Sequence, residues 1–225
     1  MELKDGLTFY EKEDLKFWKF TLDLEKKAEE MLKLLLDVNY QPDDQALIDA
    51  RELLIEIERW KAGCIDELTG HARKNSKQDV WDSFRKGMTA SSPAAAISSI
   101  TTRLNGFGVS LNEINQHPAK RASAVMRIFR PNDWGVVDWR TIAMVNALNN
   151  VEWDIDAAIV EAKDPSKDYK GLYKKVNINE QAACFYNEIY GAKKTEFLKR
   201  TADVEMAIFG LTLKVWPFPD FGRMG

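Results

Sequence analysis

The feature that most constrains the fold is a hydrophobic residue at every third or fourth position along almost the whole chain. This is the spacing of one buried face of an α-helix. One such stripe runs through residues 15–35 and a second through residues 47–68. The strand signal is confined to Gly135-Val136-Val137, a run too short to found a sheet. The sequence therefore predicts an all-α fold.

Capping residues mark where the helices begin. Asp and Ser side chains accept hydrogen bonds from the first N–H groups of a helix, and proline fits its first position. On these grounds helix starts are predicted at Asp43 or Asp44, Ser76, Ser92-Pro93, Pro118, Asp133 or Asp138, and Asp154. The helix after Ser92 is expected to end at Asn105-Gly106, and late helices are expected at about 179–191 and 202–214.

Three regions follow from this division. Residues 1–75 hold two long helices of unassigned role, which either pack in a bundle or extend as a coiled-coil arm. Residues 76–163 form a core of shorter helices. Residues 164–225 form a linker and C-terminal helices that pack back on that core.

Composition sets the broad class of the protein. Hydrophobic residues fill 45% of the 225 positions, which suffices for a buried core. No apolar run is long enough for a membrane helix and the N-terminus lacks a signal-peptide pattern, so we expect a cytoplasmic protein, nucleoid-associated in a bacterium or phage and nuclear in a eukaryote. Two cysteines, Cys64 and Cys184, are too few for an iron–sulfur cluster or a disulfide framework, and two histidines argue against zinc. No metal is therefore expected.

The distribution of charge bears on a nucleic-acid partner. A net charge of −3 argues against a protein that coats nucleic acid nonspecifically. Residues 118–140, however, contain five Lys or Arg residues against two Asp residues. We therefore expect any DNA contact to be concentrated on one face and to be strongly salt-dependent.

The segment Leu104-Asn105-Gly106-Phe107-Gly108-Val109 has the composition of a tight turn after a helix. Its two glycines allow left-handed backbone and close approach of another segment, and Phe107 between them can anchor the turn in the core. Backbone N–H groups at such a turn, beside a helix N-terminus, bind anions such as a DNA phosphate. A plain helix C-cap is the alternative interpretation.

Together with the residues that follow, this turn resembles the helix-hairpin-helix DNA glycosylases, the superfamily of endonuclease III and 8-oxoguanine glycosylase. The resemblance lies within residues 92–148 and consists of a Leu-x-Gly-φ-Gly turn, a Lys-Arg-Ala step at Lys120, and Asp138 after a Val-Val pair. Lys120 and Asp138 are eighteen residues apart, as in endonuclease III-like members. One departure is that residues 109–119 separate the turn from Lys120, which in the family follows the hairpin almost directly.

The resemblance implies a two-lobed helical fold and a DNA glycosylase that cleaves the N-glycosidic bond of a damaged or modified base in double-stranded DNA. Asp138 is then the catalytic carboxylate, and Lys120 is the amine that can form a Schiff base and add lyase activity. Each has a structural alternative, Asp138 as a helix N-cap and Lys120 as a solvated or phosphate-contacting side chain. The resemblance implies no cofactor, although it allows a monovalent cation at the hairpin.

Further residues are assigned to DNA by their place in the motif. The turn and the nearby arginines are expected to hold the DNA backbone, and two tryptophans beside Asp138 are candidates for the wall of a base pocket. The DNA-binding set is Asn105, Gly106, Phe107, Gly108, Val109, Arg121, Arg127 and Arg140, and the pocket candidates are Trp134 and Trp139. The alternatives are ordinary surface charge for the arginines and a core position for Trp139.

Two other functions fit the same sequence. One is a phage-type transferase related to the glycosylases, in which an amine displaces pyrophosphate from an activated thymine. The other is a helix-hairpin-helix protein that binds DNA without chemistry, since a fold does not dictate a function. The sequence leaves open which base is recognised and what the oligomeric state is.

Overall fold

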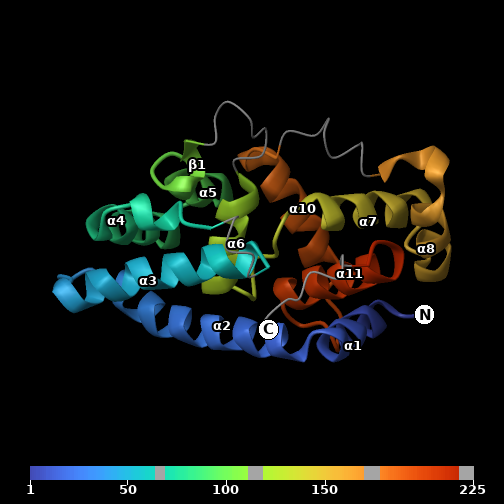
Figure 1. Ribbon diagram of the computed structural model, residues 1–225, viewed down its shortest axis with the longest axis horizontal. Coiled ribbons are helices and arrows are strands. Elements are labelled where there is room, and N and C mark those ends of the chain that lie inside the picture. Colours follow the sequence, from blue (N-terminus) through green and yellow to red (C-terminus); the bar gives the residue numbers. More distant parts are fainter. Residues whose placement is uncertain (64–68, 111–118, 170–177, 218–225) are drawn as a thin grey trace.

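The structure, a computed structural model, describes residues 1–63, 69–110, 119–169 and 178–217. Within these ranges the regular structure is helical apart from one short strand (Figure 1). The predicted all-α class is confirmed. The elements are α1 (Leu3–Glu13), α2 (Leu15–Leu36), α3 (Asp44–Lys61), η2 (Ala72–Lys74), α4 (Lys77–Met88), α5 (Pro93–Thr101), β1 (Asn105–Ser110), α6 (Ala119–Phe129), α7 (Trp139–Asn150), α8 (Ile155–Lys163), η3 (Pro165–Lys167), α10 (Glu180–Ala192) and α11 (Thr201–Val215).

Most helix starts predicted from capping residues are observed. Each capping side chain accepts a hydrogen bond from a backbone N–H in the first turn of its helix, and these caps are Asp43, Ser76, Ser92, Asp138 and Asp154. The two late helices, α10 and α11, begin within one residue of the predicted positions. The start predicted at Pro118 lies outside the described residues.

Three features differ from the sequence prediction. α5 ends at Thr101 rather than at Asn105, and residues 105–110 form the strand β1. α3 ends at Lys61, short of the predicted stripe, whose last residues lie in the undescribed range 64–68. The N-terminal segment 3–13, for which no helix is predicted, is the helix α1.

α1 owes its place to a close contact with α11 (Figure 1). A Cβ added at Gly210 would lie 2.0 Å from the carbonyl oxygen of Gly6, and one added at Gly6 would lie 2.2 Å from that of Ala207. The two helix backbones therefore touch, which only glycine permits at these positions. Because this contact joins the two ends of the chain, local periodicity does not reveal it.

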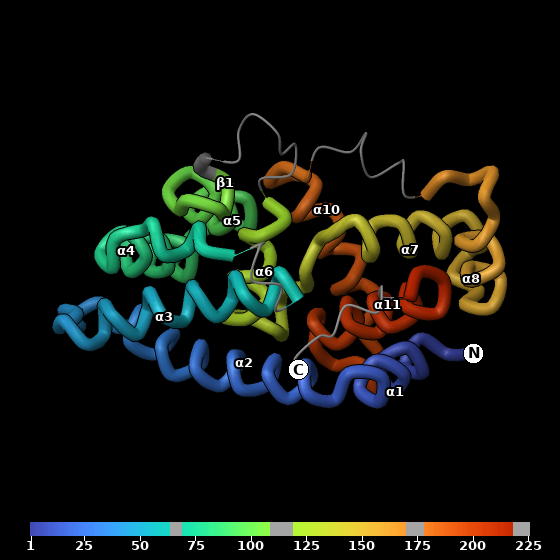
Figure 2. Tube along the Cα trace, viewed as in Figure 1, coloured from blue at the N-terminus to red at the C-terminus, as the bar shows by residue number. Residues whose placement is uncertain are grey.

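Two groups of helices lie side by side (Figure 2). α2 to α6 pack on one another, with β1 against α5 and α6, while α1, α7, α8 and α11 form the second group. α10 contacts both groups. Residues 1–75 therefore contribute to each group, since α1 joins the C-terminal helices whereas α2 and α3 join the others. No helix in the described part of the chain is long and apolar enough to cross a membrane.

Candidate active site

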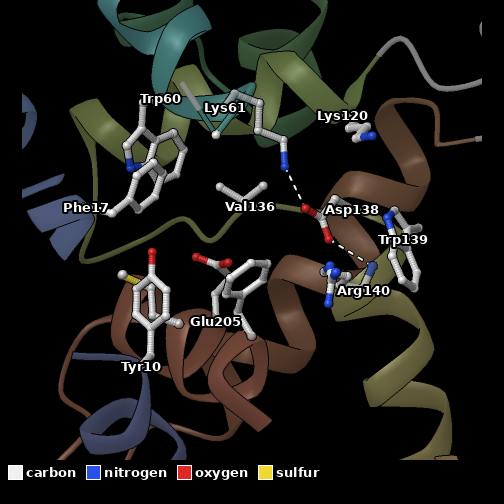
Figure 3. A pocket seen from close by; sticks show the side chains of 13 residues that line it. Tyr10, Phe17, Trp60, Lys61, Lys120, Val136, Asp138, Trp139, Arg140 and Glu205 are labelled. Carbon is white, nitrogen blue, oxygen red and sulfur yellow. Dashed lines mark hydrogen bonds and ion pairs between the residues drawn. The ribbon is translucent and has the colours of Figure 1, made fainter. Parts of the chain in front are cut away.

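A cavity of about 190 Å³ lies where segments of the two helix groups meet (Figure 3). Side chains from α1, α2, α3, α6, α7 and α11 line it, together with the segment that precedes α7. The lining residues are Tyr10, Phe17, Trp60, Lys61, Gly63, Lys120, Val136, Asp138, Trp139, Arg140, Glu205, Met206 and Phe209. The cavity thus combines aromatic walls with two lysines and two carboxyl groups.

An ion pair between Lys61 and Asp138 forms one wall of this cavity (Figure 3). The Lys61 Nζ donates to Asp138 Oδ2 at 2.7 Å, and the two side chains are 9% and 13% exposed. Removing two charges from water costs several kcal/mol per ion, so a buried pair is weak evidence for a purely stabilising role. Perturbed, buried titratable groups at a cavity are instead typical of functional sites.

The start of α7 fixes the Asp138 carboxylate. Its Oδ1 accepts the backbone N–H groups of Arg140 and Thr141 at 3.0 and 3.2 Å, and the Thr141 hydroxyl accepts the Asp138 N–H at 3.1 Å. Oδ2 remains for Lys61. The helix-cap interpretation and a role in the cavity are therefore compatible, because the two oxygens have different partners.

The charges around the pair decide its protonation. Burial raises the pKa of Asp138, but the positive charges of Lys61 and Lys120 outweigh it and bring the pKa to about 2. Burial lowers the pKa of Lys61, and so does the charge of Lys120, against the attraction of Asp138. The site therefore holds a permanent anion beside an amine that releases its proton more readily than an ordinary lysine.

The predicted lysine also belongs to this cavity. Lys120 is the second residue of α6 and is half-buried in the lining, where its charge acts on both Asp138 and Lys61. The structure thus brings together the two residues that the motif identifies, and adds Lys61 to them.

Glu205 of α11 is the second carboxyl group in the lining and is 4% exposed. Burial raises its pKa to about 7, with Asp138 contributing in the same direction and Arg127 opposing. The cavity therefore holds one carboxylate that stays ionised at neutral pH and one carboxyl group whose pKa lies near neutrality.

The predicted turn lies between α5 and α6. Gly106 has a φ of +80°, and a Cβ there would lie 2.2 Å from the Cβ of His71. Gly108 has a φ of +158°, and a Cβ there would lie 2.1 Å from the carbonyl oxygen of Thr101. Both glycines are thus required by close packing. Phe107 is fully buried, as expected of the residue that anchors the turn, so its side chain is not a DNA contact.

A buried glutamate holds the turn from α3. The carboxylate of Glu58 is 1% exposed and accepts the backbone N–H groups of residues 70–72 at 2.9 to 3.1 Å. It also accepts from Arg121 Nη1 at 2.9 Å, and the same nitrogen donates to the Gly106 carbonyl at 3.2 Å. Arg121 is 20% exposed, and this ion pair engages the charge that was assigned to a DNA phosphate.

Asn75 braces the start of β1. Its side-chain oxygen accepts the Asn105 N–H at 2.7 Å, and its amide nitrogen donates to the Asn105 carbonyl at 3.2 Å. Asn105 is half-buried. Val109 lies in β1, and its side chain is outside the described part of the chain.

Arg127 is the clearest correction among the predicted DNA contacts. Its side chain is fully buried and pairs with Glu25 at 2.5 Å. It also donates to the sulfur of Met206 at 2.8 Å and lies 3.9 Å from Glu205. A guanidinium enclosed in this way does not reach a phosphate, so Arg127 is a core ion pair and not part of a DNA surface.

The tryptophans beside Asp138 separate into two roles. Trp134 is 4% exposed in the core and is not among the cavity-lining residues, which corrects its assignment to a base pocket. Trp139 lines the cavity, and its ring lies 5.5 Å from that of Trp216. Arg140 also lines the cavity, with its guanidinium 4.8 Å from the Trp139 ring and donating to the Trp216 carbonyl.

Two carbonyl oxygens of the turn, where the resemblance allows a monovalent cation, already have side-chain partners. The carbonyl oxygens of the turn are engaged by Asn75 at Asn105 and by the positive Arg121 at Gly106. A guanidinium 3.2 Å from a carbonyl repels a second cation there. Among the described residues, no cluster of three or more His, Cys, Asp or Glu side chains is arranged to hold a metal ion.

Sequence reasoning does not identify Lys61 or Glu205. Each leaves a local signal, because Lys61 stands four residues after Ile57 on the apolar stripe of α3, and Glu205 interrupts the apolar run of α11. A charged residue on a buried face predicts a partner but does not name it.

Comparisons with known protein families, with curated proteins and with solved structures found no match. The likeness to the helix-hairpin-helix glycosylases therefore rests on the motif residues alone, and a function has to be argued from the cavity.

Proposed function

We propose that the protein is a DNA glycosylase of the helix-hairpin-helix type that excises a damaged or modified base from double-stranded DNA. The observation that carries the proposal is the buried Asp138 carboxylate, which lines the cavity and pairs with Lys61 there. The two helix groups on either side of this cavity, and a Gly-x-Gly turn packed between α5 and α6, agree with the two-lobed fold and the motif that the resemblance implies.

Asp138 suits the electrostatic part of this reaction. Breaking the bond between C1′ and the base leaves positive charge on the sugar, and a carboxylate in a site of low water content stabilises that charge. A pKa of about 2 keeps Asp138 ionised at neutral pH and makes it a poor proton acceptor. Its role in the proposal is therefore charge stabilisation.

The cavity also suits an extruded nucleotide. A base removed from the stack needs flat apolar surfaces, and Phe17 and Trp60 supply rings 5.8 Å apart and 14° from parallel at one wall. Trp60 Nε1 donates to the Thr21 hydroxyl at 2.7 Å, which fixes the indole. A volume of about 190 Å³ is below the ~300–1,000 Å³ of drug-sized pockets and favours a single base.

Two amines are available for the lyase step. A lysine that attacks C1′ has to be neutral, then forms a Schiff base with the sugar after the base has left. Lys120 is the lysine of the motif, whereas Lys61 is in contact with Asp138 and has a lowered pKa. We propose that one of these two is the nucleophile if strand cleavage accompanies base release.

The proposal is tested with a panel of duplexes that each carry one damaged or modified base. The readout is release of the free base and formation of an abasic site. We expect wild-type activity on at least one duplex and a loss of about 10²–10³-fold in Asp138→Asn, the range found when one electrostatic contact to a transition state is removed. Asp133→Asn, at an exposed position five residues away, is the matched control and should retain activity.

Two results would redirect the assignment. Duplex binding without base release, equal in wild type and Asp138→Asn, favours the non-catalytic DNA-binding protein. A product with an adducted base instead of an abasic site favours the thymine-modifying transferase.

Borohydride trapping identifies the amine. A Schiff base reduced by borohydride leaves a covalent protein–DNA complex, which Lys61→Ala or Lys120→Ala should abolish. Lys86→Ala, at an exposed position on α4, serves as the control. Trapping that survives both cavity substitutions would exclude both lysines.

A further inference from the structure

Glu205 takes no part in the charge stabilisation by Asp138 or in the lyase step, although it lies in the same cavity as Asp138. In Figure 3 its carboxyl group and the hydroxyl of Tyr10 point into the cavity from the side opposite Lys61. Val136 supplies a backbone hydrogen bond to the carboxyl group. Among the residues that the structure describes, Glu205 Oε2 has no hydrogen-bond partner.

The position of Glu205 is fixed by the chain segment that leads to Asp138. A Cβ at Gly135 would lie 2.6 Å from the Cβ of Glu205 and 2.7 Å from a ring carbon of Tyr190. Glycine at 135 thus lets the backbone pass directly over α11 and α10. The two carboxyl groups of the cavity are therefore held by one segment, residues 135–138, at two different points of its wall.

Glu205 is not needed to neutralise the arginine beside it. Arg127 already pairs with Glu25 at 2.5 Å, and Arg200 pairs with Glu25 and Asp203 at 2.6 Å each. This cluster has two positive and two negative charges without Glu205, whose Oε2 lies 3.9 Å from Arg127 Nε. The carboxyl group of Glu205 is therefore a surplus acid in a buried site, a setting that favours its protonated form.

The titratable groups that face Glu205 come from several helices. Arg127 of α6 and Lys61 of α3 favour its ionised form, whereas Asp138 opposes ionisation. Tyr190 of α10 interacts with it as well, and Tyr10 of α1 shares the cavity. Burial outweighs the two positive charges, so the pKa of Glu205 is about 7 whereas that of Asp138 is about 2.

We propose that Glu205 is the general acid that protonates the leaving base, a role that rests on the glycosylase function proposed above. Two carboxyl groups with separated protonation states in one site are typical of an acid and a charge-stabilising partner. As the bond from C1′ to the base nitrogen breaks, its electron pair goes to the base, and the base takes the proton of Glu205. Water adds to C1′ and gives its proton to the Glu205 carboxylate, which restores the acid. The net reaction is hydrolysis to a free base and an abasic sugar.

The inference is tested by single-turnover excision with wild type, Glu205→Gln and the control Glu188→Gln. For a neutral base we expect Glu205→Gln to lower the rate by about 10²–10⁴-fold, the usual contribution of a general acid. The wild-type rate should fall as the pH rises through about 7, and this fall should be absent from the residual activity of Glu205→Gln. Glu188→Gln, at an exposed position on α10 and outside the cavity lining, should keep the wild-type pH profile.

A cationic substrate separates acid catalysis from a structural role. A purine methylated at N7 carries its positive charge already and leaves without protonation, so Glu205→Gln should excise it at close to the wild-type rate. Equal losses on the neutral and the cationic base would overturn the inference, and so would unchanged excision of the neutral base.

A second measurement uses the wild-type protein alone. Carboxyl carbon NMR of protein labelled at glutamate should show one glutamate that titrates near pH 7, and a full set of ordinary titrations would overturn the inference. Absence of excision by the wild-type protein removes the proposed function together with this inference. Excision that Glu205→Gln leaves unchanged removes the inference alone.

Discussion

The buried pair of Lys61 and Asp138 makes a quantitative prediction about stability. Asp138→Asn keeps the cap of α7, because Asn caps helices as well as Asp, but leaves the Lys61 ammonium buried without a counter-charge. The shift of the Asp138 pKa from 3.8 to about 2 corresponds to about 2 kcal/mol net of burial, at ~1.4 kcal/mol per pKa unit. Breaking a buried pair from one side typically costs about 3–5 kcal/mol. We therefore expect a loss of about 2–5 kcal/mol in the free energy of unfolding.

A double-mutant cycle isolates the pair. Lys61→Met keeps most of the aliphatic stem, so the double variant Lys61→Met with Asp138→Asn has no buried charge at this position. The variants are compared by urea unfolding near neutral pH, followed by tryptophan fluorescence, with Asp133→Asn as the exposed control. The double variant should lose less free energy of unfolding than the two single variants lose together, by about 2 kcal/mol or more. Losses that add within about 0.5 kcal/mol would refute the pair as an energetic unit.

Three further predictions concern the packing and the remaining charges. Gly210→Ala should lower the free energy of unfolding by about 1–3 kcal/mol, because its Cβ would lie 2.0 Å from a carbonyl oxygen of α1. Gly191→Ala, in open space on α10, should not destabilise the protein. Equal effects of the two substitutions in urea unfolding would contradict the contact between α1 and α11. Arg127→Met should destabilise the fold by about 3–5 kcal/mol. The folded variant should keep the DNA affinity of the wild type, measured by fluorescence anisotropy, and a selective loss of affinity would restore Arg127 as a DNA contact. Burial raises the pKa of Glu205 from 4.5 to about 7, so its contribution to the free energy of unfolding is present below pH 4.5 and is lost as the pH rises through about 7. Relative to wild type, Glu205→Gln should therefore gain about 3 kcal/mol of stability between pH 4 and pH 8. A stability difference that does not change with pH would argue against the raised pKa.

Much of the secondary structure could be predicted because its causes are local. Ser76, Asp138 and Asp154 cap helices through hydrogen bonds within three residues, and such signals are present in the sequence itself. α1 could not be predicted in this way, since a glycine at position 6 weakens a helix in isolation and the contact that compensates lies on α11. β1 was not predicted because its two glycines are equally typical of a helix C-cap.

The site was only partly predictable. Asp138 and Lys120 carry a motif, and both lie at the cavity. Lys61 is 77 residues from its partner, so nothing in its neighbourhood indicates that Asp138 pairs with it. Arg127 shows the reverse error, because a basic residue near a motif suggests a DNA contact, while its counter-charge Glu25 stands on the distant helix α2. Charge along the sequence therefore overestimates the charge available at the surface.

The central claim, that the ionised Asp138 stabilises a cationic sugar, is tested most directly by binding an analogue of that sugar. A duplex with a pyrrolidine abasic site carries a positive ring nitrogen, and a duplex with tetrahydrofuran at the same position is its neutral match. Wild type should bind the pyrrolidine duplex roughly 10–100-fold more tightly, as expected for one charge-assisted hydrogen bond of about 1.5–3 kcal/mol, and Asp138→Asn should lose this preference. Equal affinity of wild type for the two duplexes, or a preference that Asp138→Asn retains, would contradict the account.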